Sequence, residues 1–167
     1  MILRLAFVAL LATLTSCTGT DRNPCGLSGS LPDVPSGTLR VTRDGKAYVV
    51  DSGLRGYRLL NDRTDIEAGE ITLAIGKDNE DRNVREQIDQ GNFPICILLN
   101  DQSDGTTYAQ VRTTGASFGT DSTRTGTVAI LAKEGDVLVG RFELEATQNG
   151  GGGTTRLEDG VFRLGPR

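Results

Sequence analysis

The most nucleophilic side chains in the sequence are three cysteines, Cys17, Cys25 and Cys96. A cysteine or serine nucleophile normally works beside a histidine that acts as general base, and the chain contains no histidine. The same absence excludes every zinc site with an imidazole ligand, and three cysteines cannot supply a four-cysteine site. Proton transfer would fall to Asp, Glu, Lys or Tyr side chains. We therefore expect a protein that is not an enzyme and has no cofactor.

Glu143 and Glu145 are the best candidates for a pair of acid and base groups. Alternate residues of a strand lie about 7 Å apart on one face, and glycosidases place two carboxyl groups about 5–9.5 Å apart. However, Arg141 alternates with these two residues, which is typical of a solvated face rather than a cleft. A carboxylate-dependent, glycan-acting enzyme is therefore the third of our three functional hypotheses.

The segment 100–105, Asn-Asp-Gln-Ser-Asp-Gly, begins like a calcium-binding loop. Asn100, Gln102 and Asp104 occupy the first, third and fifth ligand positions, and a glycine follows, as such loops require. The bidentate glutamate expected at the twelfth position is replaced by Val111. A polar turn between two strands explains the same residues. We expect no metal here and keep these three residues as calcium candidates.

The amino-terminal segment indicates export from the cytoplasm. Arg4 precedes an apolar run, Leu5 to Leu14, which is about half the length needed to span a bilayer and is typical of a signal peptide. The run ends in Leu14-Thr15-Ser16-Cys17, which resembles the bacterial lipobox. That resemblance implies a signal peptide over residues 1–16 and lipid on Cys17. Multiple acyl chains would anchor the protein stably to a membrane.

The same resemblance places the protein in the cell envelope. Thr18 follows the lipidated cysteine, whereas retention in the inner membrane of enteric bacteria is associated with an aspartate at that position. The outer membrane is therefore favoured, and the sequence leaves open which of its two sides the protein faces. An ordinary signal peptide followed by a chance cysteine is the alternative.

Cys25 and Cys96 remain as a candidate disulfide pair. An exported domain meets conditions under which disulfides form. A bond between them would close a long loop and stabilise the fold by about 3–4 kcal/mol. The alternative is two unpaired thiols, one of them buried in the core.

Composition limits the size of the domain and the class of partner. Removal of residues 1–16 takes away Arg4 and changes the net charge from −4 to −5, so no nucleic-acid partner is expected. Residues 17–36 are polar and rich in Gly, Ser and Pro, which is typical of a flexible tether that carries the lipidated cysteine. Residues 37–167 then form one domain.

The remaining sequence predicts an all-β domain. About nine segments have strand patterns and are separated by turn residues: apolar and polar residues alternate in most of them, and residues 93–99 are almost continuously apolar. This pattern predicts an antiparallel β-sandwich or flattened barrel, of which we favour the sandwich. Residues 81–91 are the one exception: Val84 and Ile88 lie one helical turn apart and Gly91 suits a helix end. We expect one short helix there at most, with the acidic residues 78–81 capping its start. The expected strands are 38–42, 47–50, 55–61, 70–76, 93–99, 106–113, 124–132, 137–146 and 156–164.

The last two strands give the clearest pattern. Phe142 and Leu144 on one strand and Phe162 and Leu164 on the next should face one core, and Glu143 and Glu145 should point outward. The motif Gly-x-Phe-x-Leu-x-Ala at 140–146, with Gly-Val-Phe at 160–162, is similar to the ending of small bacterial lipoproteins of unknown function from Bacteroidetes-like lineages. In this chain Glu158 and Asp159 replace the usual threonine and small residue. The resemblance implies this fold and an envelope location, and no activity.

Three functional hypotheses follow. The first is a membrane-anchored envelope lipoprotein whose noncatalytic β-domain is a binding or structural module, with an unknown protein, polymer or small molecule as partner. The second is a small-ligand carrier with a calycin-like barrel that encloses an apolar cavity. The glycan-acting enzyme is the third.

Overall fold

A computed structural model describes residues 25–27, 30–99, 107–121 and 125–167. This part of the chain is antiparallel β-structure with one short helix, α1 (Val84–Gln90), so the predicted all-β fold is confirmed. No helix in it is long and apolar enough to cross a membrane. The strands are β1 (Thr38–Arg43), β2 (Lys46–Val50), β3 (Arg55–Leu59), β4 (Thr64–Ala68), β5 (Ile71–Ile75), β6 (Ile95–Leu98), β7 (Tyr108–Thr113), β8 (Ala116–Gly119), β9 (Gly126–Glu134), β10 (Val137–Gln148) and β11 (Thr154–Leu164).

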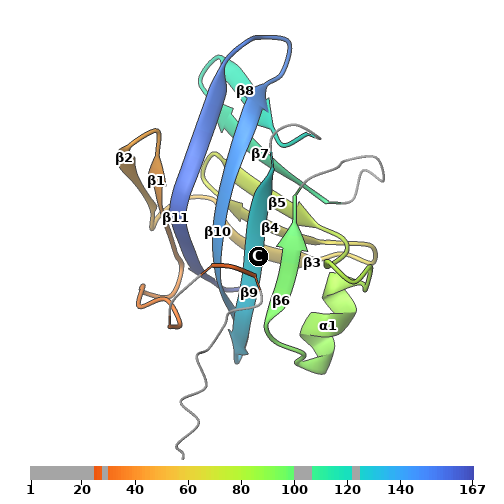
Figure 1. Ribbon diagram of the computed structural model, residues 1–167. Coiled ribbons are helices and arrows are strands. Elements are labelled where there is room, and N and C mark those ends of the chain that lie inside the picture. The colour runs from red at the N-terminus through yellow and green to blue at the C-terminus, as the bar shows by residue number, and fades with distance from the viewer. Residues whose placement is uncertain (1–24, 28–29, 100–106, 122–124) are drawn as a thin grey trace, which may run out of the picture.

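Strand β10 is the branch point of the sheet. The order is β2-β1-β11-β10-β8-β7-β5-β4-β3, and β9 also pairs with β10 and carries β6 on its other side. Pairing along β10 changes partner: residues 137–144 pair with β9, whereas Thr147 and Gln148 pair with β8. Figure 1 shows β10 and β11 as the long blue strands between the β1–β2 hairpin and the rest of the sheet.

The far end of the sheet returns to the end of the chain. The Tyr57 N–H of β3 donates to the Gly165 carbonyl at 3.0 Å, and the Arg167 N–H donates to the Tyr57 carbonyl at 3.0 Å. This short parallel bridge between Tyr57 and Pro166 nearly closes the sheet on itself. The sequence favours the sandwich of the two predicted forms; the nearly closed sheet is instead the flattened barrel, because the chain end bridges to β3.

Apolar side chains fill the interior. Phe142, Leu144, Phe162 and Leu164 are all buried in it, and the two phenylalanine rings lie 6.4 Å apart between centroids. The largest fully buried side chains are Phe142, Phe162, Leu39, Ile66, Ile71, Leu73, Ile75, Ile88, Ile95, Ile97, Leu99 and Ile130. They come from both sides of the barrel and from α1, so one continuous core holds the elements together.

Each core phenylalanine of the last hairpin lies opposite a glycine. Gly140 pairs with Phe162, and Phe142 pairs with Gly160. A Cβ added to Gly140 would lie 2.2 Å from the Phe162 ring, and one added to Gly160 would lie 2.6 Å from the Phe142 ring. Both distances are far below van der Waals contact, so the two rings fit only because the facing positions lack side chains.

Strand β11 contains a bulge beside this packing. Two of its residues, Glu158 and Asp159, oppose the single residue Glu143 of β10. Asp159 has φ 53°, a left-handed conformation that aspartate adopts more readily than most residues. Because the bulge adds one residue to β11, both Leu157 before it and Gly160 and Phe162 after it face the core. Asp159, immediately before Gly160, is thus compatible with the backbone conformation that the bulge requires.

Candidate functional site

A disulfide bond joins Cys25 to Cys96 of β6, with the two Cα atoms 5.2 Å apart. It spans 71 residues of sequence and attaches the entry segment to the barrel wall. The lipidation candidate Cys17 lies outside the described residues, as do the calcium candidates Asn100, Gln102 and Asp104. In the described part of the chain, no group of three or more His, Cys, Asp or Glu side chains is placed to hold a metal ion.

The loop before α1 covers the outer edge of β6 next to this disulfide. The Asn79 N–H donates to the Cys96 carbonyl at 3.0 Å, and the Asn79 side-chain oxygen accepts from the Leu98 N–H at 2.8 Å. Helix α1 itself is capped by Asn83, whose side chain accepts from the Glu86 N–H, and it ends at Gly91 in a left-handed conformation. The acidic residues 78–81 therefore do not cap the helix as expected, because the cap lies closer to its first turn.

Asp78 instead organises the loop. Its Oδ1 atom accepts from the N–H groups of Glu80 and Arg82, each at 2.9 Å, and its Oδ2 atom lies 2.7 Å from the Arg82 guanidinium. The side chain is only 2% exposed. Burial by itself raises the pKa of Asp78, but the hydrogen bonds and the charge of Arg82 outweigh burial and lower that pKa below its usual range.

Two adjoining surface hollows share the side chain of Glu143. One is bounded by Gly26, Arg141 and Asp159, and the other by Glu145 and Arg156 among others. Glu143 is exposed, whereas Arg141 is half-buried and donates to the Ser30 carbonyl at 2.8 Å. The strand face predicted to be a solvated row of charges is thus partly covered by the entry segment, and Glu143 is the one residue of β10 that is exposed.

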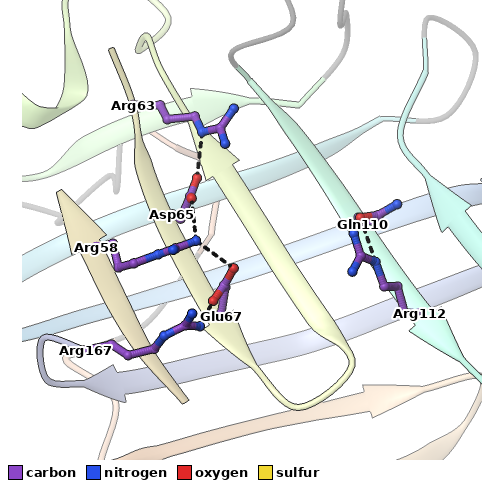
Figure 2. A network of polar contacts seen from close by, with 7 residues as sticks. All are labelled: Arg58, Arg63, Asp65, Glu67, Gln110, Arg112 and Arg167. Carbon is purple, nitrogen blue, oxygen red and sulfur yellow. Dashed lines mark hydrogen bonds and ion pairs between the residues drawn. The ribbon is translucent and has the colours of Figure 1, made fainter. Parts of the chain in front are cut away.

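A denser charged network lies on the outer face of β3 and β4. Asp65 is buried between two cations: its Oδ2 accepts from Arg58 at 3.2 Å, and its Oδ1 lies 2.9 Å from Arg63 Nε. The contact between Arg63 Nε and Asp65 Oδ1 is an ion pair only: its geometry is not that of a hydrogen bond, and neither atom has another hydrogen-bond partner. Glu67 accepts from Arg58 at 3.2 Å and from Arg167 of the chain end. Figure 2 shows these contacts, which tie the barrel closure to β4.

We call this surface the arginine face and define it as Arg58, Arg63, Asp65, Glu67, Arg112 and Arg167. Arg112 belongs to β7 on the same outer side, where it donates to Gln110 at 3.0 Å. Four cations oppose two carboxylates here, in a chain whose net charge is −4. Guanidinium groups with donors to spare bind carboxylate or phosphate groups.

The sequence interpretation missed the arginine face because it placed no strand at residues 64–68. The signal was present: Thr64, Ile66 and Ala68 alternate with Asp65 and Glu67, which is the period of a half-buried strand. A search of protein-family models, of curated proteins and of solved structures finds nothing that matches this chain.

The lowered pKa of Asp78 predicts how the free energy of unfolding depends on pH. The pKa of Asp78 in the folded protein lies below its value of about 3.9 in the unfolded chain. The ionised carboxylate therefore stabilises the fold above about pH 3.9, and this stabilisation is lost as the pH falls through the folded pKa. Asp78→Asn should lower the free energy of unfolding by about 1–3 kcal/mol at pH 7. The deficit should shrink below about pH 4, as measured by urea unfolding at several pH values.

Asp81→Asn is the matched control, because the Asp81 side chain is 81% exposed and asparagine accepts its left-handed backbone. It should change stability by less than about 0.5 kcal/mol at every pH. An Asp78→Asn deficit that stays constant down to pH 2 would show that the carboxylate charge is not what stabilises the loop.

Proposed function

We propose that this protein is an envelope lipoprotein, anchored to a membrane through lipid on Cys17, whose β-domain is a noncatalytic binding or structural module. The export signal and the lipobox-like segment support the anchor, with the outer membrane as the favoured location. The Cys25–Cys96 bond is consistent with an oxidising compartment.

The observation that carries the binding-module proposal is the filled interior. Phe142, Phe162 and the aliphatic side chains around them are less than 2% exposed and occupy the space that a carrier would reserve for its ligand. A partner of this domain would therefore meet its outer surface. The arginine face provides charged hydrogen-bond donors there, and it fits a partner that presents carboxylate or phosphate groups.

The carrier and the enzyme remain as alternatives with less support. A calycin-like carrier encloses an apolar cavity, whereas here the side chains of β10 and β11 pack against the opposite wall. A glycosidase needs one carboxyl group that is kept protonated in an apolar pocket. Glu143 is exposed to water, which leaves it without such a pocket.

The anchor is tested by replacing the cysteine that would carry the lipid. Cys17→Ser should move the protein out of the washed membrane fraction or stop its processing, because no acyl chain can be attached. Ser16→Ala keeps a small residue before the cysteine and should remain in membranes with a mature mass that includes lipid. An unmodified Cys17 in wild-type protein, measured by mass spectrometry, would contradict the anchor.

The choice between binding module and carrier is tested with an apolar fluorescent probe. Folded protein should show no saturable uptake of a fatty-acid analogue at micromolar concentrations, because side chains fill the core. The control is the variant Phe142→Ala, which opens space in the core and should take up more probe if it stays folded. Saturable micromolar binding by the wild-type protein, displaced by unlabelled fatty acid, would favour the carrier.

A further inference from the structure

The strands at the edges of the sheet differ in whether another part of the chain covers their free backbone groups. Among the described strands, three have a neighbouring strand on one side only: β2, β3 and β6. The edge of β3 is paired by the Gly165–Arg167 segment, and the edge of β6 is covered by Asn79. The edge of β2 has no partner in the part of the chain that the structure describes. Unpaired edges bind other strands readily, and proteins usually protect them.

The turn that precedes β2 fixes which of its backbone groups are free. Asp44 and Gly45 have φ 48° and 78°, and Arg43 pairs with Lys46 directly across the turn. In such a two-residue hairpin the closing pair is hydrogen-bonded, and hydrogen-bonded pairs then alternate along the ladder. Ala47 and Val49 are therefore the residues whose N–H and C=O groups point away from β1.

The β2 edge is fixed in place by side-chain contacts and lacks most of the features that protect edge strands from pairing. The Tyr48 hydroxyl accepts from the Glu70 N–H at 3.3 Å, and the Arg43 guanidinium lies 2.7 Å from the Glu70 carboxylate, which fixes the hairpin against the β4–β5 turn. Proteins protect edges with charges, prolines or bulges. Strand β2 contains one charged residue, Lys46 at its start, and its Val49 is 52% exposed.

We propose that β2 pairs with β2 of a second copy of this chain, in an antiparallel arrangement with the two-fold axis at Tyr48. In this register Ala47 of each copy lies opposite Val49 of the other copy. Each such pair exchanges N–H···O=C bonds in both directions, which satisfies the free groups of both edges at once. The two sheets then form one sheet that continues across the dimer.

The edge favours a second copy over a different partner because it is complementary to itself. The two residues with free backbone groups oppose each other, and their exposed side chains, Ala47 and Val49, are small and apolar. Two-fold dimers with identical surfaces are also the commonest protein assemblies. This inference does not depend on the lipid anchor.

Cysteine cross-linking of the full chain tests the register. Two differently tagged chains, one with Ala47→Cys and the other with Val49→Cys, are produced together, oxidised and separated without reductant. We expect a cross-linked dimer of the two tags. Each variant alone should form far less of it, because its own cysteines lie diagonally across the axis at about 7–8 Å, beyond disulfide reach. No dimer above the wild-type background, or equal amounts in all three cases, would overturn the proposal.

A second measurement does not rely on cysteines. Val49→Lys places a charge on the free edge and should weaken self-association of the purified chain at least tenfold in sedimentation equilibrium. Leu54→Lys is the control, because Leu54 is 58% exposed but lies outside β2. The dissociation constant of the dimer formed by this variant should equal that of the wild type. A wild-type chain that stays monomeric at millimolar concentration, or a Val49 variant that dimerises normally, would contradict the second copy. Cross-linking of Ala47→Cys to a different polypeptide would contradict it as well.

Discussion

The fold depends on the reciprocal packing of two phenylalanines against two glycines in the last hairpin. Strands β10 and β11 are the longest in the described chain, and the other strands join them either directly or through a neighbouring strand. β1 pairs with β11, β8 and β9 pair with β10, and β3 binds the segment that follows β11. A shift of one residue between β10 and β11 would place each ring against a side chain and turn the core residues outward. The Gly-x-Phe spacing on both strands therefore fixes the register from which the barrel is built.

Local signals in the sequence predicted the elements that local physics determines. The neighbouring strands 38–42 and 47–50, the helix around Val84 and Ile88 and the alternation along 137–146 each depend on residues close in sequence, and the structure has all of them. Strands β4 and β8 were missed. β4 carries the charged residues Asp65 and Glu67, which are typical of a turn unless arginines from neighbouring segments pair with them. β8 is four residues long and rich in small side chains, so its strand pattern is weak.

Long-range closure could not be read from the sequence. The pairing of β3 with Pro166 joins residues more than a hundred positions apart and leaves no periodic pattern. The contact of Arg167 with Glu67 in the arginine face and the contact of Asn79 with the edge of β6 also leave no periodic pattern in the sequence. The Cys25–Cys96 pair was accessible by counting cysteines, because lipidation of Cys17 would leave only these two. For function, the sequence gives only an expected location in the cell envelope, whereas the structure adds the surfaces on which the proposed function rests.

The most direct test of the central packing is the unfolding free energy of Gly140→Ala, compared with Gly152→Ala, whose added Cβ would meet nothing within 4 Å. The added methyl at 140 would overlap the Phe162 ring, so Gly140→Ala should lower stability by about 1–3 kcal/mol, and Gly152→Ala should change it by less than about 0.5 kcal/mol. Combining Gly140→Ala with Phe162→Leu should cost less than the sum of the two single changes, because the smaller side chain leaves room for the methyl group. Equal stability of the two glycine variants would show that the barrel does not depend on this packing.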